Sequence, residues 1–351
     1  MLIDWMTLRL PFSALLGQEL TDRLQAAIGR VVCIAPDGLK KWEKLALDLD
    51  ALRSDTPGLC WTIIADGEGQ RYLTIGASPA SLQHGNNVFG SADPRQCAEI
   101  LIRFAGLSLG AILPGPEAWQ CRRIDVTTNH ALGSGKEVKQ ALRLLLGADA
   151  SRSKASSKKG NSVYWNADSD LRSGKAYHKG PQLHYLAKRD KVSGLEGWQY
   201  EAADRIIRFE LKLGSRWFRR LEDGQHADLP RRWLDLTPQQ FFAEHHDYFG
   251  RFIGSMEVTD MGQLLNQLEK VAPTPGQALA AHRTWALIKS VGYDNAKESM
   301  PERTWYRHIR FLRAAGLSDA DLCAGNVIPF RQREIVLSQP LRGWDDLREA
   351  A

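Results

Sequence analysis

The sequence predicts an α+β protein in which a β-rich region built on an antiparallel sheet is followed by a helical region. Before residue 220, short segments alternate apolar and polar residues between Gly- and Pro-containing turns, as strands with one buried face do. After residue 220, apolar residues recur at helical spacing instead. We therefore predict a β-rich domain over residues 1–254 and a helical domain over residues 255–351.

Size and composition allow two folded domains. The chain has 351 residues, with 43% hydrophobic and 25% charged residues, which are ordinary values for a globular protein. Its net charge of +5 is compatible with a nucleic-acid partner without requiring one. The five cysteines are an odd number and form no Cys-x-x-Cys pair, so we expect a reducing cytoplasm. No basic leader and no run of eighteen apolar residues occurs, so we expect no membrane partner.

The first strands and the first long helix have clear boundaries. Residues 2–10 alternate as a strand that Pro11 ends, and Leu59–Ile64 and Tyr72–Ala77 form a hairpin around a Gly-containing turn. Residues 76–94 are rich in turn formers and are expected to form a fixed loop. A helix is predicted over Pro94–Leu109, with Asp93 as its N-cap.

Two later strands carry acidic residues on a polar face. In Gln120–Thr128, Asp125 shares its face with other polar residues, because side chains alternate along a strand. The segment Arg205–Leu213 alternates more cleanly and directs Arg208 and Glu210 away from the core. Each carboxylate is thereby presented on the sheet's polar side.

A polar loop lies between these two strands. Val138–Leu146 is predicted to be a helix, and the basic segment 151–161 after it contains Lys158 and Lys159. Two interpretations remain open for this segment: a solvated flexible loop, or a loop that contacts DNA phosphates.

The segment from Asn161 to Lys191 contains the candidate nucleophile. Tyr177 is flanked by Lys175 and Lys179, and a phenol with a pKa of about 10 needs neighbouring cations or a metal-polarised electrophile to react. We interpret 182–188 as a strand that presents His184 on its polar face and Tyr185 on its apolar face, which favours Tyr177 as the reactive tyrosine.

Three predicted strands thus present Asp125, His184 and Glu210 from polar faces. Carboxylate oxygens suit Mg²⁺ or Mn²⁺, and an imidazole is acceptable to Mn²⁺, so these residues are the candidate metal ligands. An ion pair with a neighbouring arginine is the alternative for each of them. Lys175 and Arg208, beside them, are the candidate DNA contacts of this region.

The helical region ends in a basic helix. Helices are predicted over Thr237–Phe249, Met261–Val271 and Gln277–Val291. A further helix follows Ser299, its candidate N-cap. Its apolar residues Trp305, Ile309 and Leu312 share one face, and its other faces carry Arg303, Arg307, Arg310 and Arg313. This helix fits the second helix of a helix-turn-helix, with a basic amphipathic surface helix as the alternative.

A basic tyrosine site, a carboxylate-lined sheet face and a helix-turn-helix candidate together suggest phosphoryl transfer on DNA. The tyrosine would attack a phosphodiester and leave a phosphotyrosyl end and a free 3′-OH.

The residues also resemble the replication initiation proteins of filamentous phages, the gene II/X family of rolling-circle nickases. The resemblance covers nearly the whole chain and is carried by six segments in the family's order: IDWMTLRLPF, IGASPASLQHGNNVFG, RRIDVT, SVYWN with AYHK, IRFELKL and GYDNAKESMPERTWYRHIRFLRAAGL. It implies that Tyr177 is the nucleophile and that Lys179 contacts phosphate. GNNVFG at 85–90 is distinctive, but we assign it no chemical role.

The resemblance also implies an activity, partners and a location. The family nicks the plus-strand origin of the double-stranded replicative form and circularises the displaced single strand, by a mechanism similar to that of HUH endonucleases. A nicking domain related to these enzymes is therefore expected, although no His-hydrophobic-His triplet occurs in the chain. Host helicase and polymerase are the implied partners, and the bacterial host's cytoplasm is the implied location. A shorter product starting at Met256 is implied as well.

Two other functions remain open at this point. One is a non-catalytic origin-binding protein whose polar sheet face only contacts phosphates. The other is a plasmid relaxase or transposase-like enzyme that uses the same tyrosine chemistry.

Overall fold

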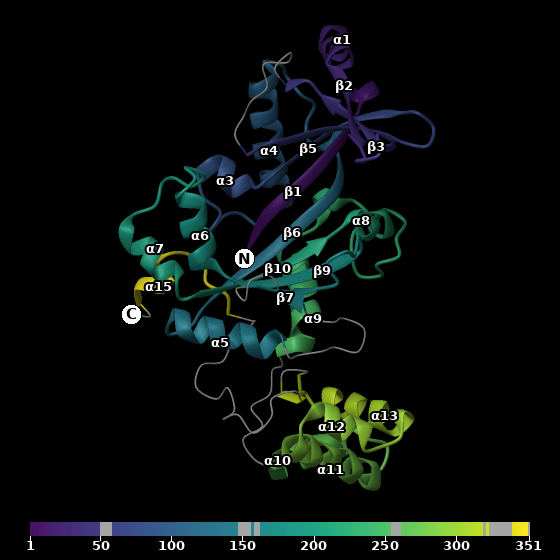
Figure 1. Cartoon of the computed structure of the whole chain (residues 1–351), viewed down its shortest axis with the longest axis vertical. Helices are drawn as coiled ribbons and strands as arrows, with labels where there is room; N and C mark the ends of the chain where they lie inside the picture. Colours follow the sequence, from purple (N-terminus) through teal and green to yellow (C-terminus); the bar gives the residue numbers. More distant parts are fainter. Residues whose placement is uncertain are drawn as a thin grey trace.

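The protein is built around one large antiparallel sheet. The computed structural model describes residues 1–49, 58–146, 156–157, 162–253, 261–318, 321–322 and 339–349. Eight strands pair in the order β4-β5-β1-β6-β10-β9-β8-β7, and their pairings are all antiparallel (Figure 1). Their bounds are β1 Leu2–Pro11, β4 Cys60–Ala65, β5 Arg71–Ala77, β6 Gln120–Ala131, β7 Ser156–Ser157, β8 Ser162–Trp165, β9 Arg172–His178 and β10 Ile206–Leu213.

The strands predicted from alternation are confirmed. Residues 2–10 and 120–128 fall within β1 and β6, the hairpin over 59–77 corresponds to β4 and β5, and 205–213 corresponds to β10. Along β1, Met6, Leu8 and Leu10 are fully buried and the residues between them are only half-buried. One face of the sheet therefore lies in the core, and the other face remains polar.

Helices cover the apolar face of the sheet. Helix α4 contacts β1 and β5, helices α8 and α9 contact β6, and helix α5 contacts β8, β9 and β10. These helices are α4 Pro94–Leu109, α5 Gly135–Leu146, α8 Ser215–Glu222 and α9 Pro238–Ile253, and three short 3-10 turns lie at Phe12–Ala14, Pro116–Ala118 and Trp233–Asp235. The predicted cap of α4 is confirmed, because the Asp93 side chain accepts a hydrogen bond from the Gln96 amide at 2.9 Å.

Two predictions of local structure are wrong. The predicted strand over 182–188 is instead part of helix α6, Lys179–Ala187, which is followed by α7, Gly197–Ala203. Pro181 is tolerated in the first turn of α6, where amide groups have no acceptor within the helix. The predicted loop over 76–94 contains the short helix α3, Pro79–His84, which the side chain of Ser78 caps.

The start of β1 contains a bulge. Its pairing with β6 shifts between Ile3 and Trp5, so Asp4 has no partner of its own in the ladder. A bulge changes the direction in which a side chain points. Asp4 is buried, and its carboxyl hydrogen-bonds to Glu210 on β10. Strict alternation along β1 would instead place Asp4 on the same face as the core residues Met6 and Leu8.

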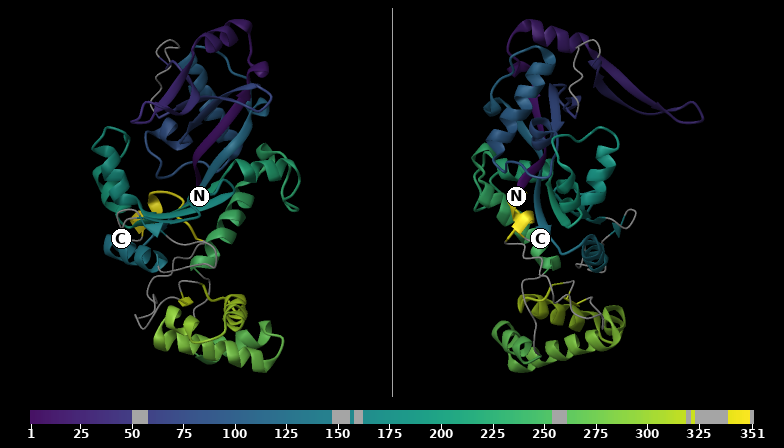
Figure 2. Two further views of the ribbon diagram at one scale, coloured as in Figure 1. Left: turned by 45° about the vertical axis from the view of Figure 1, so that its right-hand side comes forward. Right: turned by 90° about the vertical axis from the view of Figure 1, so that its left-hand side faces the viewer.

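Two further strands form a separate hairpin. Strand β2, Ile28–Ile34, pairs only with β3, Lys40–Leu47, among the described residues, and both follow helix α1, Gln18–Ala26. In the right-hand view of Figure 2 this ribbon extends well beyond the body of the molecule.

Four helices after residue 260 share a hydrophobic core of their own. They are α10 Met261–Val271, α11 Pro275–Val291, α12 Tyr293–Glu298 and α13 Glu302–Ala314. Trp305, Ile309 and Leu312 are buried in this cluster, as the sequence predicts for one face of α13. Ser299, however, is the C-cap of α12, and the cap position of α13 is Pro301. Met256 lies outside the described residues.

The last described segment returns to the sheet. The Leu341 amide donates a hydrogen bond to the Asn129 carbonyl at 2.8 Å, and Arg205 donates to the Leu347 carbonyl at 2.7 Å. Leu347, in the short helix α15 at Asp345–Glu349, is buried in a cluster with Val88. The division at residue 254 stays a prediction, but residues 339–349 pack with elements on its N-terminal side.

A search of the described helices for a membrane span finds none of sufficient length and apolar character.

Candidate active site

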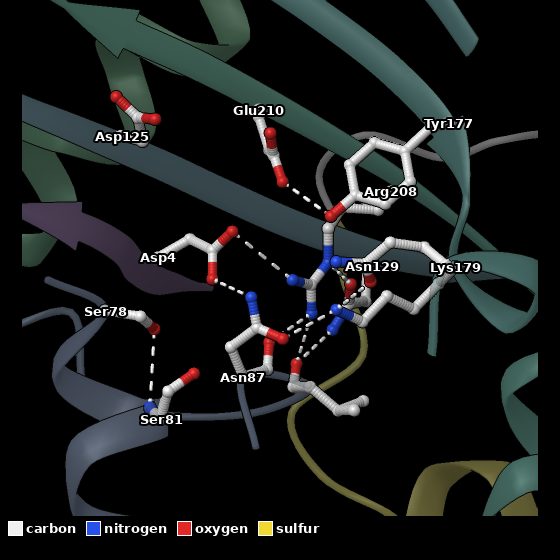
Figure 3. A network of polar contacts seen from close by, with 12 residues as sticks. Asp4, Ser78, Ser81, Asn87, Asp125, Asn129, Tyr177, Lys179, Arg208 and Glu210 are labelled. Carbon is white, nitrogen blue, oxygen red and sulfur yellow. Dashed lines mark hydrogen bonds and ion pairs between the residues drawn. The ribbon is translucent and has the colours of Figure 1, made fainter. Parts of the chain in front are cut away.

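Polar side chains from neighbouring strands meet on the sheet face opposite helices α4, α5, α8 and α9. β10 contributes Arg208 and Glu210, because Phe209 between them points into the core, and β9 contributes Tyr177 directly opposite Arg208. The bulge in β1 adds Asp4, and the loop before α4 adds Asn87 (Figure 3). The strands thus bring together residues distant in the sequence.

Tyr177 and Glu210 form a short hydrogen bond within this cluster. The Tyr177 hydroxyl donates to Glu210 Oε1 at 2.6 Å, and Lys175 Nζ lies 3.4 Å from Glu210 Oε2. The same ammonium lies 3.9 Å from the centre of the Tyr177 ring. Burial and the Glu210 charge raise the pKa of Tyr177 well above 10, so the phenol is protonated in the resting site. Lys175 therefore lies directly beside the candidate nucleophile.

The carboxyls of Asp4 and Glu210 are coupled, and their pKa values move in opposite directions. Burial raises the pKa of Asp4 to about 6, although Arg208 opposes the shift. Burial also opposes ionisation of Glu210, but the charges of Lys175 and Arg208 and hydrogen bonds from Asp4 and Tyr177 outweigh it and lower its pKa to about 2. Below about pH 6 Asp4 therefore carries the proton that it donates to the ionised Glu210, and the pair titrates as one unit.

Asn87 connects the two halves of the cluster. Its amide nitrogen donates to Asp4 Oδ1 at 2.7 Å, and its amide oxygen accepts from Lys179 Nζ at 2.8 Å. Lys179 is completely buried and also donates to Gln182 at 2.8 Å. Burial, followed by the nearby charge of Arg208, lowers the pKa of Lys179 well below 10.5. In this arrangement Lys179 fixes the Asn87 loop.

Arg208 has a structural position, contrary to its predicted DNA contact. Its guanidinium donates to Asn129 Oδ1 and to the carbonyls of Asn87 and Val88, each at 2.7 Å. The remaining nitrogen lies 3.6 Å from Asp4 Oδ2. The side chain is completely buried, so it cannot reach a DNA phosphate in this conformation.

The predicted metal ligands do not converge. Asp125 is held by Arg123 through contacts of 2.7 and 2.5 Å, and Figure 3 draws no contact between Asp125 and the network. His184 lies on α6, where it is half exposed and 3.9 Å from Asp204. Within the described residues, no three or more His, Cys, Asp or Glu side chains are grouped to hold a metal. The structure therefore does not bring Asp125, His184 and Glu210 together as one site.

Asp4 and Glu210 fit a divalent cation better. Their hydrogen bond brings two carboxyls together in a buried site, and Mg²⁺ is commonly held by one or two carboxylates together with substrate phosphates. Burial and the charge of Glu210 both raise the pKa of Asp4, and a divalent cation would offset both effects. These two oxygen donors, with a phosphate, suit Mg²⁺ or Mn²⁺.

Comparison with known proteins agrees with the resemblance noted in the sequence. Residues 2–237 match the model of a family described as the N-terminal part of a phage replication-associated protein. The chain belongs to this family. It is 25% identical to the replication-associated protein of Salmonella phage IKe, over 98% of this chain and 96% of that protein. Its identity to the proteins of the same name in Enterobacteria phages fd and M13 is 24%, over 93% of this chain and 94% of each.

The matched region of this family includes every residue of the cluster, but not the predicted contacts of the last basic helix. Arg303, Arg307 and Arg310 are exposed on α13. Lys158 and Lys159 lie outside the described residues. These five DNA contacts stay predictions.

Sequence reasoning missed Asp4 and Asn87. Asp4 is an acid within an otherwise apolar and aromatic strand, which is a usable signal, but the bulge that directs it toward Glu210 cannot be read from alternation. Asn87 lies in the distinctive GNNVFG loop, to which we assigned no chemistry. Its two hydrogen bonds, to a carboxyl and to a lysine, supply that role.

Proposed function

We propose that this chain is a phage replication initiator that nicks one strand of DNA through a covalent bond to Tyr177. The observation that carries the proposal is the Tyr177 hydroxyl, held at 2.6 Å by Glu210 beside the Lys175 ammonium. Membership of a family described as replication-associated supports a role in DNA replication. The antiparallel sheet with a tyrosine on its polar face is compatible with a distant relation to HUH endonucleases.

The proposed step exchanges one ester for another. Tyr177 Oη attacks the phosphorus of a phosphodiester, the new Oη–P bond forms, and the bond from phosphorus to the 3′ oxygen breaks. The phenolic proton passes to Glu210, and the leaving 3′ oxygen takes a proton from water, which leaves a 5′-phosphotyrosine and a free 3′-OH. Because the ester bond is conserved, the same 3′-OH or another can attack the phosphotyrosine and rejoin the strand.

The resting site must change before this attack. Glu210 is a weak base and Tyr177 a weak acid, and each unit between their pKa values costs about 1.4 kcal/mol of proton-transfer free energy. Lys175 is only 31% exposed and lies over the Tyr177 ring, so its charge stabilises a developing phenolate. The phosphate approaches on this side, because Glu210 and Lys175 are partly exposed there.

We propose Asp4 and Glu210 as the residues that hold Mg²⁺ or Mn²⁺. Such an ion supplies Lewis-acid polarisation of the phosphoryl oxygens. A bound cation would reduce the repulsion between the two carboxylates. At lower pH, a proton on Asp4 reduces this repulsion in the same way.

The proposed partners follow from the family and the charge distribution. They are the double-stranded origin and the single strand displaced from it, with host helicase and polymerase in the host cytoplasm. Helices α12 and α13, joined by residues 299–301, are our candidate helix-turn-helix, because α13 exposes Arg303, Arg307 and Arg310.

A covalent adduct tests the proposal directly. The full chain, incubated with Mn²⁺ and single-stranded oligonucleotides tiling a candidate origin, should yield a phosphotyrosyl peptide that contains Tyr177 by mass spectrometry. Tyr177→Phe should give no adduct and no nicked plasmid, with duplex binding kept within a few-fold. An adduct on another tyrosine, or wild-type nicking by Tyr177→Phe, would contradict the assignment. Duplex binding without any adduct would favour a non-catalytic origin-binding protein.

A further inference from the structure

The β2–β3 ribbon has no place in the site described above. It is a two-stranded sheet separate from the eight-stranded one, and it projects from the molecule in Figure 2. A two-stranded hairpin alone is marginally stable in water, so an exposed one needs support at its base or a partner.

The base of the ribbon is anchored. Ile28, Leu45 and Leu47 pack against the main hydrophobic core, and the Asp48 amide donates to the Ala27 carbonyl at 2.9 Å. Beyond this base the burial falls away on both strands. The ribbon is therefore a fixed arm with an uncovered outer part.

The uncovered part combines apolar and basic side chains. Five apolar residues are exposed by 42% to 68%: Val31, Val32, Ile34, Leu39 and Trp42. Four basic residues stand against two acidic ones between residues 28 and 47: Arg30, Lys40, Lys41 and Lys44 against Asp37 and Glu43. Exposed apolar groups in such number mark an interaction surface.

The edges of the ribbon are unsuited to pairing with a strand of another protein. Pairing shifts between Cys33 and Ile34, which leaves Lys41 as an extra residue on β3. A bulge and lysines at an edge are devices that prevent edge-to-edge strand pairing. The surface is thus suited to an anionic partner that does not extend the sheet.

We propose that the β2–β3 ribbon binds duplex DNA as a groove-inserted arm, separate from the nicking site and from α13. The major groove, about 12 Å wide, admits a two-stranded ribbon. Seven strand residues at about 3.3 Å each give an arm of roughly 20 Å, which is enough to cross a groove.

Charge complementarity assigns separate roles to its side chains. Glu43 is neutralised by Arg30 at 3.3 Å and Lys40 at 3.0 Å, so it repels phosphate little. Lys41 and Lys44 form no ion pair among the described residues and contact the phosphates. Trp42, with Lys44 5.9 Å above its ring, makes the apolar contact with the groove wall.

The salt dependence of duplex binding tests the arm. The full-length Lys41→Ala/Lys44→Ala variant is compared with Lys188→Ala/Lys191→Ala, which removes two exposed lysines beyond α6. A short duplex of arbitrary sequence serves as the probe, in fluorescence anisotropy. The arm variant should lower the slope of log affinity against log salt by about 1.8, since each phosphate contact contributes about 0.9. The control should leave the slope unchanged, and cleavage of single-stranded origin DNA should be unaffected in both.

Trp42→Ala separates the apolar contact from the charged ones. It should weaken duplex binding at every salt concentration without changing the slope. An unchanged slope in the arm variant, or an equal fall in the control, overturns the proposal. So does a dimer in sedimentation that Trp42→Ala dissociates while duplex affinity stays constant, because the ribbon would then be a protein interface.

Discussion

At the scale of single residues, one proton determines the charge of the site. Asp4 and Glu210 lie in hydrogen-bond contact, yet their pKa values move in opposite directions, to about 6 and about 2. Glu210 keeps its charge because Lys175 and Arg208 lie close to it, whereas burial keeps Asp4 protonated up to about pH 6. The site therefore has a hydrogen-bond acceptor ready for Tyr177 and a carboxyl that a cation can ionise.

The first prediction concerns stability against pH. A carboxyl whose folded pKa is raised contributes stability that is complete below its unfolded value, 3.8, and is lost as the pH rises through about 6. The Asp4→Asn side chain resembles the protonated acid but does not ionise, so the stability of this variant should not fall as the pH rises. At neutral pH the variant should gain up to about 3 kcal/mol in unfolding free energy over the wild type, at about 1.4 kcal/mol per pKa unit.

Urea unfolding at neutral pH and below 3.8 measures this difference, which should vanish at the acidic pH. A gain of equal size at both pH values would show that titration of Asp4 is not its source. The same variant should lose nicking activity, because it removes a proposed cation ligand.

A second prediction at this scale concerns Arg208. Replacing it with methionine leaves Asn129 Oδ1 and the carbonyls of Asn87 and Val88 without their donor. Removing one partner of a buried ion pair costs about 3–5 kcal/mol, so Arg208→Met should lose stability of that size in urea unfolding. Arg307→Met, an exposed arginine on α13, is the control and should change stability by no more than about 0.5 kcal/mol. A small effect at Arg208 would show that these buried hydrogen bonds do not stabilise the fold.

At the scale of elements, the alternation of apolar and polar residues predicted strands correctly where one face of the strand is apolar over many residues. Residues 205–213 are predicted correctly because four inward residues belong to one large core. The segment 182–188 is too short for the spacing of its apolar residues to distinguish a strand from a helix. Its structure depends on tertiary packing instead, because Leu183 is buried in the small cluster with Val88 and Leu347. That cluster depends on residues 339–349, far along the chain. His184 was misplaced for this reason.

The third prediction tests this returning segment. Ending the chain after residue 338 would expose Val88, Leu183 and Ile206, now fully buried. Each such side chain contributes about 1.5–3 kcal/mol when buried, and the freed segment regains conformational entropy, so we expect a net loss of about 2–4 kcal/mol. Urea unfolding of the sheet region measures it. Arg342→Ala, an exposed residue of the same segment, should have little effect. Unchanged stability after truncation would mean that the segment does not hold the sheet in solution.

At the scale of the whole molecule, the fold class and the change from strands to helices were predictable, whereas the shape of the site was not. Strand periods and helix caps are local, so the sequence displays them. Asp4, Asn87 and Tyr177 come together through a bulge, a loop and a strand pairing that span more than half of the predicted β-rich domain. Only long-range packing fixes such an arrangement, and this is also why Asp125 looked equivalent to Glu210.

The last prediction concerns the helical region as an independent unit. Helices α10–α13 have their own core, but Leu341, Trp344 and Leu347 lie against the other part of the chain. Fragments 256–351 and 256–338 should therefore be equally helical and melt together by circular dichroism, while the longer one exposes apolar residues and binds more of a hydrophobic dye. Both should bind duplex DNA without nicking it, since Tyr177, Asp4 and Glu210 are absent.

The DNA contacts of α13 can be tested in the shorter fragment. Arg307→Ala/Arg310→Ala should lower the slope of log affinity against log salt concentration by about 1.8, at about 0.9 per phosphate contact. An unfolded shorter fragment would refute the predicted boundary, and a folded one without affinity for DNA would leave α13 as an ordinary surface helix.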